Sequence, residues 1–404
     1  MSNCEEHRGS IIDTEDKTYI LIDELGNGSY ATVWSCYNVE MKTLYAIKIF
    51  KYSESKAGNI EIEYYKKLKN INIVSMHNSF EYDNKVCIVL DLTLGSLYDV
   101  MQNGICNKNT FTNGFDIDFI IKIIYNILLT LKDLHSQNIL HGDIKPENIL
   151  LYGITEKQKQ MEHKLKNTSN NKHYEYIQYI QDIQDTDNSI INTDTADNLE
   201  NSDNSGSDMS MAPRKMKFTS SDTKSEQSQH TIIIPEIYMQ KPIVKLSDFG
   251  ACVDITNSKK PFGVQTKYYK SPEIILHTGY GLQCDIWALG CTLYEFITGS
   301  ILFDPDEYNI DSKRGILHLI YAIIEPIPNE MINSSPIKQI FYTNDCLLKG
   351  KIEHKTSIWT KLVEHIKSDT IKKYLLIDLL LEMLMVDPNK RITASDAINH
   401  PLFT

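Results

Sequence analysis

The hydrophobic pattern of this chain changes character near Gly95, and the change limits what the chain can fold into. Before Gly95, β-branched and aromatic residues alternate with other residues in short segments that are typical of strands. Four such segments lie at residues 19–25, 31–38, 44–50 and 86–90, with one helical stretch at 59–68. After Gly95, apolar residues recur at helical spacing at 117–134, 285–297, 314–324, 358–366 and 371–385. We therefore predict an α+β fold in which a small antiparallel β-sheet lobe precedes a larger, mostly helical lobe.

The 404 residues can bury a large core and are enough for more than one lobe. Residues 1–18 lack periodicity, and we interpret them as an N-terminal tail. We expect the first lobe at 19–94 and the second at 95–152 and 241–404. Between the two parts of the second lobe, residues 153–240 lose the core pattern, which predicts a long insertion.

The insertion contains an acidic stretch at 182–208, with eight acidic residues and no Lys or Arg. Such a stretch cannot bury enough apolar surface to offset the entropy lost on ordering, which predicts disorder. A polar helix is expected at 156–185 and a strand at 231–237. Two interpretations stay open: a solvated loop without a specific function, or a regulatory or localisation arm. The arm would use candidate phosphorylation sites and a weak basic patch, formed by Ser220, Ser221, Ser225, Arg214, Lys215 and Lys217.

Cysteine spacing and hydropathy exclude several classes of protein. The eight cysteines are scattered without a Cys-x-x-Cys pair, so we expect reduced, packed thiols rather than a zinc site or a disulfide framework. No apolar run approaches the roughly 18 residues needed to span a bilayer, and the polar start does not resemble a signal peptide. We expect a soluble, intracellular monomer without membrane contact, in the cytoplasm or also in the nucleus.

The net charge of the chain indicates which kinds of partner it can bind. A formal net charge of −12 argues against direct nucleic-acid binding and permits attraction to basic partners. Frequent Asn, Ile, Lys and Tyr residues suggest an AT-rich genome, such as that of a protist or a large DNA virus.

The most specific motif is the run His-Gly-Asp-Ile-Lys-Pro-Glu-Asn at 141–148, with Asp-Phe-Gly at 248–250. Asp143 can accept a hydroxyl proton, and Lys145 can steady a transferring phosphoryl group. Asn148 and Asp248 offer the hard oxygen ligands that Mg²⁺ prefers. A loop rich in Asp, Pro and Asn is more often only a turn, but these residues at these spacings are rare by chance. The run therefore indicates a phosphoryl-transfer site.

A glycine-rich segment between two predicted strands could approach phosphates. Gly26 and Gly28 leave backbone N–H groups bare, and Ala31 is small enough for the third glycine position of the usual pattern. Alone, the segment could equally be an ordinary hairpin. The candidate ATP-binding residues of this segment are Leu25, Gly26, Asn27, Gly28, Ser29, Tyr30, Ala31, Thr32 and Val33.

Lys48 follows Ala46 and Ile47 near the end of a predicted strand, where a cation between apolar residues needs an anionic partner. We expect Lys48 to contact the nucleotide α- and β-phosphates and to pair with a helix glutamate. Helical spacing selects Glu61 over Glu63, because only Glu61 shares a face with apolar residues. The alternative is a lysine that extends to solvent at a strand end.

The predicted strand at 86–90 leads into Asp-Leu-Thr-Leu-Gly at 91–95, an extended link between the lobes. Backbone groups near Asp91 and Thr93 could pair with the adenine edge of ATP. This prediction rests on position alone.

Together these residues resemble the eukaryotic protein kinase family over about 19–152 and 241–404. Further matches are Ser-Pro-Glu at 271–273, Asp-Ile-Trp-Ala-Leu-Gly at 285–290 and Asp-Pro-Asn-Lys-Arg-Ile-Thr-Ala at 387–394. The resemblance implies a bilobal kinase fold, ATP and Mg²⁺ as cofactors, and a buried ion pair between Glu273 and Arg391. It also implies the Ser/Thr-specific pattern, carried by Lys145 and Thr266.

Within the family, the chain looks most like the SR-protein kinases of the CMGC group, which carry a long spacer at the same place. That resemblance implies a protein substrate that is basic or rich in Arg and Ser. Lys267 and Lys270 stand where arginines are usual, and lysine lacks the bidentate fork of arginine. An acidic docking region is partly kept, with Asp304, Asp306, Glu307 and Asp311 followed by Lys313 and Arg314.

Gly142 stands where the family usually has an arginine before the catalytic aspartate. The cation that would read an activation-segment phosphate is therefore missing. We predict that activity does not require phosphorylation of the segment from Asp248 to Glu273.

Two other functions remain as alternatives. A pseudokinase scaffold would bind partners without chemistry, but Lys48, Asp143, Asn148 and Asp248 are all present. A kinase for small molecules is disfavoured by the peptide-positioning matches at Thr266 and 271–273.

Overall fold

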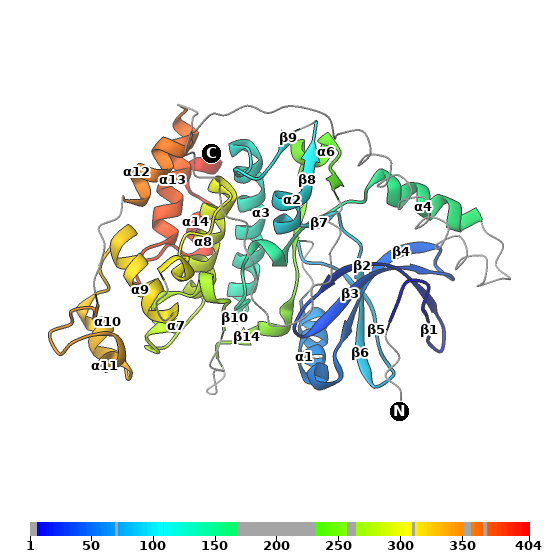
Figure 1. Cartoon of the computed structure of the whole chain (residues 1–404), viewed down its shortest axis with the longest axis horizontal. Helices are drawn as coiled ribbons and strands as arrows, with labels where there is room; N and C mark the ends of the chain where they lie inside the picture. Colours follow the sequence, from blue (N-terminus) through cyan, green and yellow to red (C-terminus); the bar gives the residue numbers. More distant parts are fainter. Residues whose placement is uncertain are drawn as a thin grey trace, which may run out of the picture.

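The computed structural model describes residues 6–68, 72–107, 109–167, 231–256, 264–308, 312–350, 357–366 and 370–404. These residues form two lobes: a β-sheet with one helix, and a larger body of helices (Figure 1). Figure 1 shows the sheet lobe in blue at one end and helices α3, α8, α9 and α13 in the other lobe.

The first lobe is built on a six-stranded antiparallel sheet with strand order β1-β2-β3-β4-β6-β5. Its strands are β1 (Ile11–Asp13), β2 (Thr18–Asn27), β3 (Ala31–Asn38), β4 (Thr43–Phe50), β5 (Met76–Tyr82) and β6 (Lys85–Asp91). Alternation along β2 sends Ile20 and Ile22 into the main core, while Tyr19 and Leu21 join a second cluster on the other face. Both faces of the sheet are therefore apolar.

The single helix of this lobe, α1 (Ser55–Lys67), begins four residues before the predicted start. Its first turn carries Ser55, Lys56 and Gly58, which supply no apolar periodicity, so the pattern starts late. A Cβ at Gly58 would lie 2.9 Å from Val86 Cγ1, so glycine lets α1 approach the sheet closely.

Two strands of the six-stranded sheet were not anticipated from the sequence. Residues 11–13, expected in a tail, form β1, and Ile12 pairs with Tyr19 and is fully buried. Three residues are too few for a periodicity to be visible. Strand β5 (Met76–Tyr82) has the sequence Met-His-Asn-Ser-Phe-Glu-Tyr, whose polar residues hide the alternation. It lies at the sheet edge beside β6.

The second lobe is mostly helical, as predicted, with each long helix within two residues of its expected ends. Its helices are α2 (Leu97–Asn103), α3 (Ile117–Ser136), α7 (Pro272–Ile275), α8 (Gln283–Thr298), α9 (Ser312–Ile323), α10 (Asn329–Ser334), α11 (Lys338–Phe341), α12 (Ile358–His365), α13 (Ile371–Met383) and α14 (Ala394–Ala397). Residues 284–297 of α8 are all buried, so this helix is the centre of the lobe.

Short strands between the helices form one two-stranded and two three-stranded sheets. They are β7 (Gly95–Ser96), β8 (Gly104–Cys106), β9 (Asn109–Thr110), β10 (Ile139–Leu140), β11 (Ile149–Leu151), β12 (Ile232–Ile233), β13 (Val244–Leu246) and β14 (Val253–Asp254). β11 pairs antiparallel with β13, and β10 with β14. These pairings bring residues 139–151 against residues 244–254, which lie far away in the sequence.

The structure describes both flanks of the predicted insertion, residues 153–167 and 231–240. Helix α4 (Glu156–Asn167) begins where the polar helix was expected, and Met161 and Leu165 are its buried residues. The expected strand at 231–237 is wrong beyond β12, because Pro235 starts helix α6 (Glu236–Gln240). The acidic stretch at 182–208 and the candidate sites between 214 and 225 lie outside the described residues.

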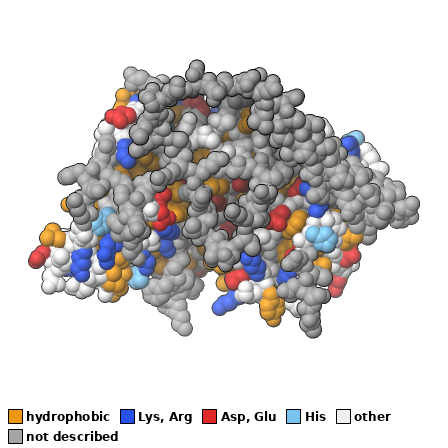
Figure 2. All heavy atoms as spheres, viewed as in Figure 1, with side chains coloured by type: hydrophobic (Ala, Val, Ile, Leu, Met, Phe, Trp, Pro, Cys, Tyr) orange, Lys and Arg blue, Asp and Glu red, His pale blue; other side chains and the backbone are white. Residues whose placement is uncertain are grey.

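Two further features are the distribution of surface charge and the length and apolar character of the helices. On the face shown in Figure 2, the described Lys and Arg side chains lie among Asp and Glu side chains. None of the helices in the described ranges is long and apolar enough to cross a membrane.

The position of β1 yields a stability prediction. Replacing the fully buried Ile12 with Ala should lower the free energy of unfolding by about 2–5 kcal/mol, because it leaves a cavity under the sheet. Glu15→Ala, at an exposed site nearby, should change it by less than about 0.5 kcal/mol. Urea unfolding followed by circular dichroism measures both. Equal stability of the two variants would mean that β1 is not part of the folded sheet.

Candidate active site

Lys48 joins the two lobes through an ion cluster with Glu61 and Asp248. Its Nζ lies 2.7 Å from Glu61 Oε2 on α1 and 3.0 Å from Asp248 Oδ1 after β13. Glu61 is fully buried, whereas Glu63 is exposed, as the helical spacing indicated. Burial opposes the charge of Lys48, but attraction to Glu61 and Asp248 raises its pKa above the ordinary value. Lys48 is therefore a fixed cation at the junction of sheet, helix and second lobe.

Asp143, the candidate base, lies in a network with the side chains of Lys145, Thr266 and Asn148. Lys145 donates from Nζ to Asp143 Oδ2 at 2.7 Å and to Thr266 Oγ1 at 3.0 Å. Thr266 donates from its hydroxyl to Asp143 Oδ1 at 2.7 Å. Burial disfavours the charge of Lys145, but Asp143 outweighs it and raises the pKa of Lys145. The segments around 143 and 266 are thus joined at one carboxylate.

The antiparallel pairing of β11 with β13 determines where the two candidate metal ligands, Asn148 and Asp248, lie. Asn148 immediately precedes β11, and Asp248 closely follows β13, so an antiparallel pair holds them at the same end. The Asn148 amide nitrogen donates to the Asp143 carbonyl at 2.8 Å and to its Oδ2 at 3.1 Å. The amide oxygen is not used in these bonds. Asp248 has φ of 64°, and Lys48 lowers its pKa despite burial, so it is an anion in an uncommon backbone conformation.

These two oxygen donors fit Mg²⁺, which is commonly bound by one or two carboxylates together with substrate phosphates. Among the described residues, no cluster of three or more His, Cys, Asp or Glu side chains could hold a metal by itself. A site that the protein completes only with a phosphate-bearing ligand is consistent with both observations.

The glycine-rich segment forms the hairpin between β2 and β3. Gly26 pairs with Val33, and Gly28 donates its N–H to the Ala31 carbonyl at 2.9 Å. A Cβ at Gly26 would meet nothing within 4 Å, so the backbone is open there. Tyr30, at the tip, is exposed, while Ala31 is buried. The residues at 27–30 are exposed, so the tip can meet a ligand.

The link between the lobes is held through the Asp91 side chain. Lys245 donates to Asp91 Oδ2 at 2.7 Å, the Ser75 N–H to the same oxygen at 3.1 Å, and His77 Nε2 lies 2.7 Å from Oδ1. Burial alone would raise the pKa of Asp91, but these bonds hold it well below its usual range. The Asp91 N–H donates to the Ser75 carbonyl at 3.1 Å, which leaves the Asp91 carbonyl and the Thr93 backbone as candidates for the adenine edge. No sequence pattern indicated a role for Lys245 or His77.

Asp285 is a further site residue whose role was not recognised. It is fully buried in α8 and accepts from the N–H of His141 at 2.8 Å and of Gly142 at 2.9 Å. His135 Nε2 lies 3.0 Å from the same carboxylate. The sequence signal for Asp285 was its place in the family match at 285–290. Asp285 fixes the backbone that carries Asp143.

Gly142 has a backbone reason for being glycine. Its φ is 79°, and a Cβ would lie 2.7 Å from the Ala251 carbonyl oxygen. The Gly142 carbonyl accepts from the Gln265 N–H at 2.7 Å. A side chain at 142 would strain this turn, which is tied to the segment before Thr266.

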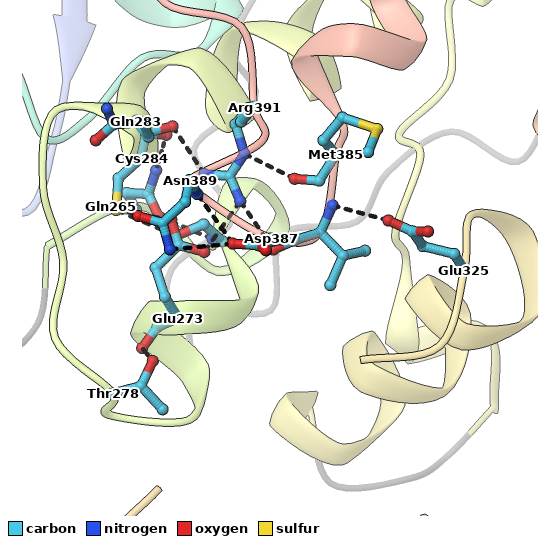
Figure 3. Close-up of polar contacts among 12 residues, drawn as sticks. Gln265, Glu273, Thr278, Gln283, Cys284, Glu325, Met385, Asp387, Asn389 and Arg391 are labelled. Atoms are coloured by element: carbon cyan, nitrogen blue, oxygen red, sulfur yellow. Dashed lines mark hydrogen bonds and ion pairs between the residues drawn. The ribbon is translucent and has the colours of Figure 1, made fainter. Parts of the chain in front are cut away.

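Glu273 and Arg391 form the buried ion pair that the resemblance implied, which confirms that expectation (Figure 3). The two N–O distances are 2.7 and 3.1 Å, and both side chains are at most 2% exposed. Arg391 also donates to the carbonyls of Gln283 and Val386, and its guanidinium lies 5.0 Å from the Trp287 ring. These contacts tie Glu273, the end of the segment 248–273, to α8 and to the C-terminal part of the chain.

Arg391→Leu should lower the free energy of unfolding by about 3–5 kcal/mol, because it leaves Glu273 buried without a cation. Lys390→Leu, one residue away and exposed, should change it by less than about 0.5 kcal/mol. Urea unfolding of both variants measures the difference. A loss for Arg391→Leu no larger than for Lys390→Leu would contradict a structural role for the pair.

The protein kinase domain model matches residues 19–166 and 231–403 of this chain. Serine/threonine-protein kinase AFC3 of Arabidopsis thaliana is 25% identical over 413 residues, covering 98% of this chain and 84% of the relative. Dual specificity protein kinase CLK1 of Mus musculus is 26% identical over 403 residues, covering 95% and 66%.

A solved structure, the PF14_0431 kinase domain, has the same fold with a TM-score of 0.64 at 20% identity, covering 99% of this chain and 98% of that one. The expected bilobal fold and the CMGC group are confirmed, although the relatives reported above carry the names AFC and CLK rather than SR-protein kinase. The family model covers most of both lobes and the candidate site between them. This chain therefore belongs to the protein kinase family.

Proposed function

We propose that this chain transfers the γ-phosphoryl group of ATP to serine and threonine hydroxyls of protein substrates, with Mg²⁺ as the metal. The observation that supports the proposal is the hydrogen-bond network at Asp143. Its Oδ1 accepts from the Thr266 hydroxyl and its Oδ2 accepts from Lys145 Nζ, each at 2.7 Å. A carboxylate, a lysine and a threonine in this arrangement serve phosphoryl transfer to a peptide hydroxyl.

Asp143 acts on the substrate hydroxyl. Its carboxylate accepts the proton as the hydroxyl oxygen attacks the γ-phosphorus and the bond to the β-phosphate oxygen breaks. Lys145 stays protonated because Asp143 raises its pKa, so it can offset negative charge on the transferring group. Thr266 bonds the same carboxylate, which orients Asp143 and ties it to residues 266–273, the peptide-positioning segment.

ATP would bind between the lobes. Lys48, fixed by Glu61, contacts the α- and β-phosphates, and the hairpin around Gly26 and Gly28 covers them. The carbonyl of Asp91 and the backbone of Thr93 meet the adenine edge. When bound by Asn148 and Asp248, Mg²⁺ would neutralise phosphate charge and hold the phosphates in position.

We propose that the substrates are proteins, with basic or Arg/Ser-rich sequences the first to be tested because the chain carries a net charge of −12. The relatives are named as serine/threonine and dual specificity kinases, which supports a protein hydroxyl as acceptor. A peptide array with Arg/Ser-repeat, acidic and proline-directed sequences distinguishes these classes.

Asp143→Asn should abolish phosphate incorporation on such an array while leaving Mg·ATP binding within about threefold, because only the proton acceptor is lost. Asp248→Ala should instead weaken Mg-dependent nucleotide binding. Labelled ATP measures transfer, and calorimetry with and without Mg²⁺ measures binding. Asp118→Asn, on the exposed start of α3, is the control for loss of one negative charge. Near-normal transfer by Asp143→Asn would refute its assignment as the base.

We also propose that activity does not depend on phosphorylation of residues 248–273. The turn at Gly142 supplies no cation for a phosphate, and unmodified Thr266 already donates to Asp143. Protein expressed in bacteria and treated with phosphatase should keep its full activity towards the best array peptide.

Mass spectrometry confirms that this material carries no phosphate, and mock-treated protein is the control. The proposal is refuted if the phosphatase-treated protein is inactive until Thr266, Tyr268 or Tyr269 is phosphorylated.

A further inference from the structure

We propose that Asp306 is a positioning residue for the protein substrate, which holds the segment after Thr266 in place without a phosphate. This inference rests on the proposed function, because it concerns how that site orients its peptide. Asp306 lies in the 3-10 helix η5 (Pro305–Tyr308), between α8 and α9, and outside the catalytic network.

Asp306 binds two successive residues of the peptide-positioning segment, one with each carboxylate oxygen. Lys267 Nζ lies 2.6 Å from Oδ1, and the Tyr268 hydroxyl donates to Oδ2 at 2.8 Å. The Lys267 ammonium also lies 5.0 Å from the Tyr268 ring. A carboxylate that accepts from two neighbouring side chains fixes the orientation of the backbone between them, which a single ion pair would not do.

The residues held by Asp306 sit between two other anchors. Thr266 is bonded to Asp143, and Tyr269 donates its hydroxyl to Glu295 Oε2 at 2.7 Å. The four successive residues 266–269, in and just before a 3-10 helix, are therefore tied to three side chains of the second lobe: Asp143, Asp306 and Glu295. If the Asp306 contacts are lost, the middle of this turn is released while both ends stay attached.

The 3-10 helix η5 that carries Asp306 is held in place by local contacts. Its N–H donates to Asp304 Oδ1 at 3.0 Å, and the preceding Pro305 is buried. A Cβ at Gly315 in α9 would lie 2.6 Å from Pro305 Cβ, so α9 packs directly on η5. Asp306 can therefore transmit the position of η5 and α9 to the segment that meets the peptide.

This assignment changes the expectation for the acidic docking region. Both oxygens of Asp306 are bound by Lys267 and Tyr268 of the same chain, so Asp306 acts inside the protein rather than as a contact for a basic substrate side chain. A basic substrate would have to displace Lys267 to reach it.

Asp306→Asn tests the proposal, because an amide oxygen and an NH₂ group cannot accept from both donors. The KM for the best array peptide should rise about 3- to 10-fold, the size expected for two exposed polar contacts, with the KM for ATP within about twofold of wild type. Asp306→Glu, which keeps both acceptors, should recover much of the loss. Lys267→Met and Tyr268→Phe should each give a smaller rise and add little to Asp306→Asn.

Glu330→Gln, an exposed acid on α10, is the matched control for the loss of one negative charge and should leave both KM values unchanged. If the wild type is active and Asp306→Asn has the same KM for peptide as the wild type, the inference about Asp306 is overturned and the proposed function is not. Equal rises in the KM for peptide and for ATP would also overturn it, because they indicate a general loss of structure. Absence of any serine or threonine phosphorylation by the wild type would refute the proposed function, and the inference with it.

Discussion

The buried carboxylate of Asp285 is the contact on which the rest of the site depends. It accepts the N–H groups of His141 and Gly142 and lies 3.0 Å from His135, so it joins α8, the loop after β10 and α3. Each of these buried donors would cost about 1–3 kcal/mol if left without a partner. Asp285 therefore determines where the loop backbone lies, and Asp143 is the next residue along that backbone.

From this loop, two strand pairs carry the arrangement to residues far away in the sequence. β10 pairs with β14 and β11 with β13, so the segment around Asp248 runs alongside the loop that holds Asp143 and Asn148. Lys48 then connects Asp248 to Glu61 on α1 and so to the first lobe. The acidic insertion can occupy the sequence between β11 and β13 because the strands that flank it fix their own register.

Periodicity predicted what depends on local patterns. The long helices, strands β3 and β4, and the inward direction of Glu61 all follow from apolar residues repeating at a fixed spacing, because the buried face of an element repeats with its geometry. The ion pair of Glu273 with Arg391 joins residues far apart in the chain, and only the family resemblance indicated it. Strand β1 was missed because three residues are too few to show a period.

Contacts that depend on tertiary placement could not be read from the sequence. Three sets of contacts join elements whose proximity no local pattern encodes. Asp91 is bound by Lys245 and His77, Asp285 binds the loop backbone, and Asp306 binds Lys267 and Tyr268. Polar side chains in such positions look the same in the sequence as solvated ones. Their roles became visible only when the partners were seen together.

In the proposed function, this preformed network performs phosphoryl transfer to serine and threonine. The most direct measurement is phosphoamino-acid analysis of a protein substrate after incubation of the full chain with γ-labelled ATP. We expect labelled phosphoserine or phosphothreonine, which should not form when EDTA is added before ATP to remove Mg²⁺. Binding of Mg·ATP with no label in either amino acid would contradict it and would indicate a scaffold that binds nucleotide without catalysis.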